Sequence, residues 1–256
     1  MLLILVVSTS GFFVQKTYAA TGSTSVSQTI TGGALNLSST ASVLLSSVTV
    51  NVASSQNATG NLGTVTITDS RGNGLGWSTT ATSSHFVQVN TPIKQSGSNN
   101  TLTSGGTYSN AAGGTYTVTV SSGGASGVAQ YTVSGLETQA ATTTGSGVAI
   151  GTRGVTATFA AATYVVGDSW TIRVDVLPVT GFLVTPSAVT TVSGLSTGVT
   201  AGSAHTFTST SDPTTIVVAS SGNGMGSYTN NPALQLTVPA SSFAGTYSAT
   251  VTETLS

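Results

Sequence analysis

The sequence contains no cysteine and very little charge. Its 256 residues include 5 Lys and Arg and 6 Asp and Glu, so 4% of the chain is charged, against roughly a quarter of an ordinary soluble domain. Without cysteine, an exported chain has no disulfide framework, and its stability must come from core size and sheet pairing. The basic residues are few and scattered and cannot neutralise a phosphate backbone, so we expect no nucleic-acid binding.

The composition nevertheless predicts a folded protein. Disordered chains are usually polar and carry a high net charge, whereas this chain has a formal net charge of −1 and a mean hydropathy of +0.29. Solubility must then come from Ser, Thr, Asn and Gln side chains. This composition is typical of secreted surface proteins and ordered assemblies, because a freely diffusing cytosolic enzyme normally relies on net charge to resist association.

The first 20 residues have the pattern of a secretory signal peptide. Apolar residues dominate positions 2–7 and 12–14, and the small residues Ala19 and Ala20 follow. The stretch is too short for a transmembrane helix, so we expect cleavage after Ala19 or Ala20, a secreted cell-surface protein, and no membrane span in the mature chain. The alternative interpretation is a buried N-terminal strand.

Short alternating apolar runs predict an all-β, antiparallel β-sandwich. In residues 24–52 the pattern places Val, Leu and Ile at alternate positions between Ser and Thr, and residues 53–61 have the polar composition of a loop. No helical period longer than one turn occurs after the signal segment. Turn signals recur about every 8–12 residues, as in a β-sandwich.

The chain changes character at residue 87, which predicts two domains. Residues 87–106 are irregular and polar, and a new set of short strand patterns then runs to about residue 176. We expect a discontinuous β-sandwich from residues 21–89 and 179–256, with a second, inserted β-sandwich-like domain at residues 90–178, because insertions are tolerated at loop tips. The alternative is one longer, continuous sandwich.

A glycine-rich turn at residues 69–77 follows the clearest strand pattern. Val65 and Ile67 alternate with threonines, which predicts a half-buried strand. Three glycines at every second position come next, and then Trp77. A large apolar side chain directly after a glycine turn predicts an anchor in the core. A similar motif returns at residues 222–228 and ends at Tyr228.

These turns, together with the strand pattern at residues 244–255, resemble the WxL domain, a cell-wall-binding surface module of Gram-positive bacteria. That family shows an Asp-x-Arg turn running into Gly-Trp-x-Leu, and a distal Tyr-x-x-x-Leu-Thr-Trp-x-Leu. Thr79 stands in place of the proximal leucine, and Glu253 replaces the distal tryptophan. The resemblance covers residues 24–86 and 182–256, and it implies noncovalent attachment to the wall. The matching residues are Asp69, Arg71, Gly76, Trp77, Tyr247, Val251, Thr252 and Leu255.

The candidate site consists of charged and aromatic residues from these motifs: Asp69, Arg71, Trp77, Tyr228, Tyr247 and Glu253. In one interpretation they bind a wall glycan, with aromatic rings stacking on sugars and carboxylates accepting hydroxyl hydrogens. In the other, Asp69 and Arg71 pair across the turn and hold its shape, because residues two apart on a strand share one face. The sequence favours the second interpretation. Glu253 shares a parity with apolar residues, where a carboxylate requires a partner.

Neither catalysis nor metal binding has support in the sequence. Residues 194–198 match a nucleophile-elbow pattern around Ser196, but no helix follows and the later histidine, His205, is seven residues on. His85 and His205 are isolated, which favours strand-edge side chains over metal ligands. We therefore expect a protein that is not an enzyme and has no catalytic residues, cofactor or metal.

Two functions remain. The first is a secreted, non-enzymatic cell-surface protein attached noncovalently to the bacterial cell wall, with cell-wall glycan, peptidoglycan or other surface proteins as partners. The alternative is a structural subunit of an extracellular filament, sheath or surface layer, a homopolymer assembled by strand or sheet-edge contacts. The scarcity of charge removes the usual protection against edge-to-edge pairing. In the second case residues 21–32 are a candidate donated strand.

Overall fold

A computed structural model describes residues 25–98 and 100–256. The predicted signal segment, residues 1–20, lies outside these residues. The predicted fold class is confirmed, because the protein is all-β and every strand pairing is antiparallel. One short 3-10 turn, η1 (Val179–Gly181), interrupts the strands. In the part of the chain that the structure describes, no helix is long and apolar enough to cross a membrane.

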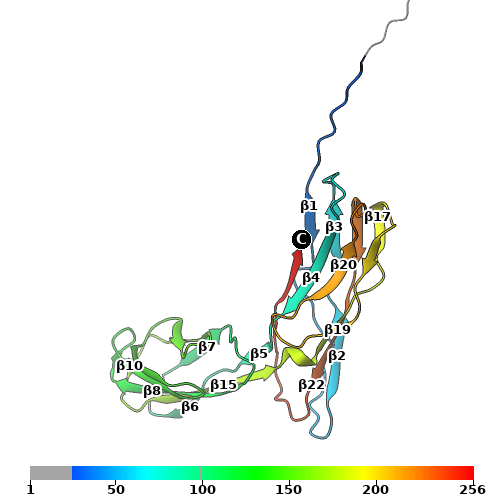
Figure 1. Cartoon of the computed structure of the whole chain (residues 1–256). Coiled ribbons are helices and arrows are strands. Elements are labelled where there is room, and N and C mark those ends of the chain that lie inside the picture. Colours follow the sequence, from blue (N-terminus) through cyan, green and yellow to red (C-terminus); the bar gives the residue numbers. More distant parts are fainter. Residues whose placement is uncertain (1–24, 99) are drawn as a thin grey trace, which may run out of the picture. The chain divides into compact units, whose positions relative to one another are not determined.

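Three four-stranded sheets come from the two ends of the sequence (Figure 1). The first has the order β1 (Leu35–Ser38), β3 (Val65–Asp69), β21 (Gly226–Asn230) and β17 (Thr190–Gly194). The second is β19 (His205–Thr206), β16 (Phe182–Thr185), β22 (Ala233–Val238) and β2 (Gln56–Asn61). The third is β18 (Val199–Ala201), β20 (Thr214–Ala219), β4 (Trp77–Ser83) and β23 (Val251–Leu255).

The middle of the sequence forms three further sheets (Figure 1). The largest has the order β11 (Gln139–Thr143), β10 (Gln130–Gly135), β8 (Gly114–Ser122), β15 (Ser169–Leu177) and β5 (Phe86–Val89), and β6 (Ile93–Ser96) also pairs with β15. A three-stranded sheet contains β12 (Val148–Ile150), β13 (Val155–Phe159) and β7 (Leu102–Gly106). The pair β14 (Thr163–Tyr164) and β9 (Gly124–Ala125) completes the set.

The buried side chains fall into two separate clusters. The body core draws on residues 58–86 and 177–236, and the insertion core on residues 102–174. The boundary runs along β5 and β15, where Phe86 and Leu177 belong to the body core while their neighbours Val87 and Val176 pack on the insertion core. Two cores are what an insertion requires, but residues 32–256 form one unit of packed residues. Independent folding of residues 90–178 therefore stays a prediction.

Strand alternation accounts for the body core. In β3, Val65 and Ile67 are fully buried while the threonines that follow each of them, Thr66 and Thr68, are only partly covered. The pairing of β1 with β3 places Leu37 opposite Ile67, so the two strands bury matching faces. On β4, Trp77, Thr79 and Ala81 share the inner face.

The predicted loop at residues 53–61 is wrong over its second half, because residues 56–61 form β2. This segment has almost no large apolar side chain, so its sequence carries no strand signal. Its strand conformation comes from pairing with β22 along its whole length, where Ala58 lies opposite Leu236 and Gly60 opposite Leu234. Tertiary pairing has overridden local propensity here.

Two other stretches with a strand pattern form no strand. Residues 25–34 are exposed and outside any sheet, and so is most of residues 40–52, although Leu45 and Val48 pack against the body core. The alternation in both stretches is genuine, but a strand exists only where a neighbouring strand accepts its hydrogen bonds. In the part of the chain that the structure describes, the backbone contacts of these stretches with neighbouring segments are isolated, as at Gly33 and Ala34 with Ser70 and at Ser46 with Thr59, and they do not continue as a ladder.

Candidate functional site

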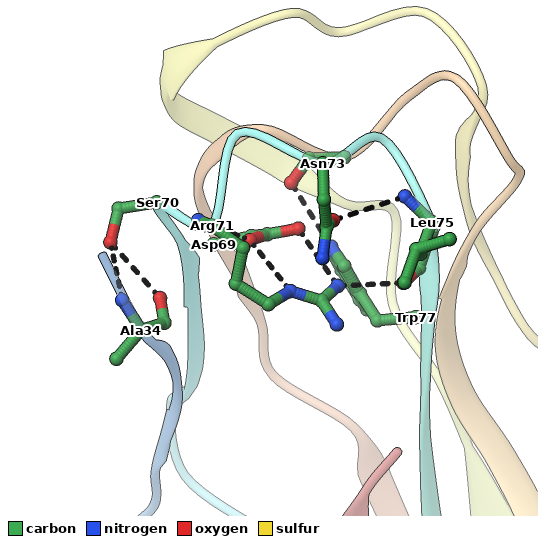
Figure 2. A network of polar contacts seen from close by, with 9 residues as sticks. Ala34, Asp69, Ser70, Arg71, Asn73, Leu75 and Trp77 are labelled. Atoms are coloured by element: carbon green, nitrogen blue, oxygen red, sulfur yellow. Dashed lines mark hydrogen bonds and ion pairs between the residues drawn. The ribbon is translucent and has the colours of Figure 1, made fainter. Parts of the chain in front are cut away.

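The first glycine turn is held closed by an ion pair between Asp69 and Arg71 (Figure 2). The guanidinium donates from Nε to Asp69 Oδ1 and from Nη2 to Oδ2, each at 3.0 Å, and Nη2 also donates to the Gly76 carbonyl oxygen at 2.7 Å. The backbone N–H of Arg71 adds a further bond to Asp69 Oδ1 at 2.9 Å. Asp69 is buried, and the side-chain hydrogen bonds from Arg71 lower its pKa below its ordinary value. The pair braces the turn, as the structural interpretation predicts.

Trp77 anchors both glycine turns. Its side chain is 4% exposed, and its indole Nε1 donates to the carbonyl oxygen of Gly224 at 3.0 Å. Its ring centroid lies 5.7 Å from that of Tyr228. Gly224 has a φ of 87°, and a Cβ at this position would lie 2.6 Å from the indole nitrogen, so both conformation and space require glycine there.

Strand pairing brings the two turns together. Ala219, the last residue of β20, lies opposite Trp77, the first residue of β4. The first glycine turn ends at Trp77 and the second follows Ala219, so the two turns meet at one end of the body. There the Gly222 N–H donates to the Gly74 carbonyl oxygen at 2.7 Å. The buried Tyr228 hydroxyl lies 2.6 Å from the Leu195 carbonyl oxygen and 3.0 Å from that of Met225. Burial raises the pKa of Tyr228, which remains a neutral donor.

Above these buried anchors, large apolar side chains face solvent. Leu75 is 71% exposed, Met225 44% and Leu195 58%, and Val192 on the neighbouring edge strand β17 is 62% exposed. We call these four residues the turn surface. The backbones that carry them are fixed by Arg71, Trp77 and Tyr228, so the turn surface is rigidly presented. Four such residues clustered on one end are a candidate contact surface.

Sequence reasoning did not predict the turn surface, although a signal for it exists. Leu75 and Met225 each stand between two glycines, in Gly-Leu-Gly and Gly-Met-Gly. Glycines on both sides place such a residue at the crest of a turn, outside the alternation that directs a side chain into a sheet core. A large apolar residue in that position is exposed unless another chain covers it.

Four of the six predicted site residues lie together, namely Asp69, Arg71, Trp77 and Tyr228. All except the partly exposed Arg71 are buried. Tyr247 lies elsewhere, with its hydroxyl donating to the Phe243 carbonyl oxygen at 3.0 Å and its pKa raised by burial. The resemblance also predicts that the Trp77 indole packs against the C-terminal strand that carries Tyr247 and Val251. That strand, β23, does pair with β4, but its register places Leu255 opposite Thr79 and Val251 opposite Ser83, about 20 Å along β4 from Trp77.

Glu253 is also remote from the turns. It lies opposite Ala81, which is buried, and its Oε1 is buried without a hydrogen-bond partner among the described residues. Within β23 it occupies the half-buried parity between Val251 and Leu255. The predicted need for a partner is therefore unmet, and Glu253 is a source of instability for this strand.

The remaining polar side chains brace loops. His205 lies 3.0 Å from Asp212, which also accepts hydrogen bonds from the backbone and hydroxyl of Thr208. His85 accepts a hydrogen bond from the Val179 N–H, and burial lowers its pKa. Ser196 lies in the loop after β17, with β18 and not a helix following it. Within residues 25–98 and 100–256, no group of three or more His, Cys, Asp or Glu is placed to hold a metal ion.

A second polar centre, which the sequence did not single out, lies in the insertion. The carboxylate of Asp168 is fully buried and accepts hydrogen bonds from the Ser98 backbone and hydroxyl and from the Val165 N–H. Lys94 Nζ lies 3.3 Å from it and 3.7 Å above the ring of Trp170. Burial raises the pKa of Asp168, but the hydrogen bonds outweigh it and the pKa is lowered. The cluster closes a loop onto the insertion core.

All four Lys and Arg residues of the described chain are in ion pairs. Arg71, Lys94, Arg153 and Arg173 pair with Asp69, Asp168, Glu137 and Asp175, at distances of 2.9–3.5 Å. These four positive charges are therefore neutralised locally. They act on loop shape and not on partners at a distance.

No family model matches this chain, and comparisons with curated proteins and with solved structures also gave no match. The fold class is therefore described from the structure alone, as an all-β, antiparallel, sandwich-like protein.

Proposed function

We propose that the chain is a secreted, non-enzymatic cell-surface protein that attaches noncovalently to the bacterial cell wall. The resemblance of the turns and of β23 to the WxL domain supports this proposal. The observation that carries it is the turn surface, in which buried charged and aromatic residues hold exposed aliphatic side chains in fixed positions.

The chemistry of the turn surface favours a wall-associated protein over bare glycan as the partner. Sugar stacking requires an exposed aromatic face, but Trp77 and Tyr228 are buried. Leu75, Leu195 and Met225 offer apolar contact area, which is typical of the centre of a protein interface.

Sedimentation with purified wall sacculi tests the proposal. The mature protein is incubated with sacculi that keep their associated proteins and with sacculi stripped of them. We expect retention on the first and weak retention on the second. The double variant Leu75→Ser and Met225→Ser is expected to lose retention without unfolding, because both side chains are exposed.

A matched control is Val128→Ser with Val166→Ser, which removes two apolar side chains from the insertion that are at least 63% exposed. This control should bind like the parent. Equal retention on both kinds of sacculi would indicate that the partner is the glycan itself. No retention on either would overturn wall attachment.

A second candidate function, a structural subunit of an extracellular filament, sheath or surface layer, is favoured by the sheet edges. Of the six edge strands of the three body sheets, β23 contains Glu253. The other five, β1, β17, β18, β19 and β2, contain no Asp, Glu, Lys, Arg or Pro, which are the residues that normally prevent edge-to-edge pairing. Electron microscopy of the concentrated mature protein is expected to show ordered polymers. Monodisperse particles at every concentration would exclude this function.

A further inference from the structure

The body contains an apolar groove at the end away from the glycine turns. Its volume is about 960 Å³, and body-core side chains form its floor, including Phe86, Leu177, Phe182 and Leu236. Residues 40–51 and 242–251 line its sides, and both are irregular up to the start of β23. The groove therefore lies over part of the body core, between two segments that are not joined by a sheet, and these four floor side chains are 1–8% exposed.

One side of the groove has the features of an unpaired strand. Leu45 and Val48 pack inward, while the backbone is left almost without partners. Within the described residues, Ser46 is the one member of residues 40–50 that makes a backbone–backbone hydrogen bond, from its N–H to Thr59 O at 2.7 Å. An extended peptide laid along this side would find free donors and acceptors and an apolar floor, as in strand addition.

The same chain carries a segment that fits such a groove. Residues 25–34 are exposed, belong to no sheet and contain no charged residue. Val26 is 89% exposed and Ile30 is 90% exposed, and Gln28 lies between them on the same parity. As a strand, this segment would present Val26 and Ile30 on one face. Two exposed aliphatic side chains on an uncharged extended chain are unfavourable in water unless something covers them.

Chain length favours the groove of another copy. The Gly33 N–H is bonded to Ser70 O, at the glycine-turn end of the body. The eight residues 25–32 span at most about 29 Å when fully extended. Along β4 and its continuation, the distance from Trp77 at the turn end to Phe86 on the groove floor is already about 30 Å. The full reach of this segment is therefore no longer than the distance from the turn end to the groove floor.

We propose that the groove binds residues 25–34 of a second copy of this chain as an added strand, with Val26 and Ile30 on the apolar floor. Each copy then has one donor segment and one acceptor groove. Such a head-to-tail contact does not close on itself by two-fold symmetry, so it generates a filament or a ring. The inference rests on the second candidate function and names its contact.

Charge substitutions on the two parities of the donor test the proposal. Ile30→Asp would place a carboxylate on the apolar floor and is expected to abolish assembly of the mature protein in sedimentation and electron microscopy. Thr29→Asp adds the same charge on the opposite parity and should assemble like the parent. Both sites are exposed in the single chain, so neither variant should change the melting temperature of the dilute protein.

Disulfide cross-linking locates the contact, since the chain has no cysteine of its own. Ile30→Cys in a copy with one tag and Val50→Cys in a copy with a second tag should give a mixed-tag disulfide dimer. Ser27→Cys should not. Assembly that survives Ile30→Asp, without a mixed-tag dimer, would overturn the donated strand and leave the structural function intact. A parent protein that stays monomeric and uncross-linked at high concentration would overturn both.

Discussion

Trp77 is the residue on which the geometry of both glycine turns depends. It fills the space beneath the second turn and satisfies the Gly224 carbonyl group. Glycine-rich loops lose much backbone entropy on folding, and a buried indole offsets part of that loss. The turn surface therefore owes its rigidity to a side chain that does not reach the surface.

Replacing Trp77 with alanine is expected to destabilise the protein by about 3–5 kcal/mol. Trp77→Phe should cost less, because it keeps most of the packing against Tyr228 and loses the bond to Gly224. Chemical denaturation followed by circular dichroism measures both changes. An alanine variant that unfolds like the parent would mean that the indole is not an anchor.

Asp69 gives the turn a defined acid sensitivity. Its folded pKa lies below the ordinary value of 3.8, mainly because of its hydrogen bonds from Arg71, so the ionised form is favoured by folding. The resulting stability is complete above that ordinary pKa and is lost as the pH falls through the folded pKa. Asp69→Asn should therefore lower the melting temperature at neutral pH, and the difference from the parent should shrink on acidification. A difference that stays constant down to about pH 2 would contradict this account.

Glu253 is expected to destabilise β23, the strand in which it lies. Its carboxylate occupies an inward parity and has a buried oxygen without a partner. Glu253→Leu should raise the melting temperature, because it removes a desolvated charge and adds apolar burial. Thr254→Leu, on the exposed parity of the same strand, is the control and should leave the temperature nearly unchanged. Stabilisation by both variants alike would point to general strand propensity.

At the scale of elements, β5 and β15 form the connection between the two cores. Val89 and Val174 are paired neighbours on these strands, so the chain leaves the body and returns to it at one place. This geometry refines the predicted boundaries. A cut at residues 90–178 would remove the partner of β5, whereas a cut between the paired residues Val89 and Val174 keeps the pairing.

We expect the body to fold without the insertion. Joining Val89 to Val174 through Asn-Gly replaces residues 90–173 by a two-residue hairpin turn, for which this dipeptide is favoured. The shortened protein should unfold in one cooperative transition by calorimetry. Loss of a cooperative transition would mean that the two cores depend on each other, as in the single continuous sandwich that the sequence also allowed.

Elements with strong local patterns could be predicted from the sequence. The alternation in β3 and β1 and the ion pair of Asp69 with Arg71 are local features, since they depend on residues two apart. The strand β2 and the partners of Trp77 could not be predicted, because both arise from pairing between segments more than 130 residues apart. The strand predicted within residues 40–51 is absent for the opposite reason, because this segment has the pattern of a strand but makes only isolated backbone hydrogen bonds to its neighbours.

At the scale of the whole molecule, the ion pairs leave no unpaired basic residue in the described chain. Contacts through the turn surface or the groove are apolar and should depend little on screening. Wall retention and assembly should therefore be similar at about 0.05 M and about 0.5 M sodium chloride, and stronger in ammonium sulfate, which favours apolar burial. Release at the higher sodium chloride concentration would reveal an electrostatic contact instead.

The same ion pairs have a consequence for resistance to proteolysis. Proteases of the trypsin type cleave after lysine and arginine, and the described chain has four such positions in total, at residues 71, 94, 153 and 173. At each of them the cationic head group already contacts a carboxylate, and the side chains are 22–38% exposed. A protease cleft that recognises a free basic side chain therefore meets, at each of these positions, a side chain that is already paired. The folded protein presents few cutting points to one of the commonest kinds of extracellular protease, without a single cross-link.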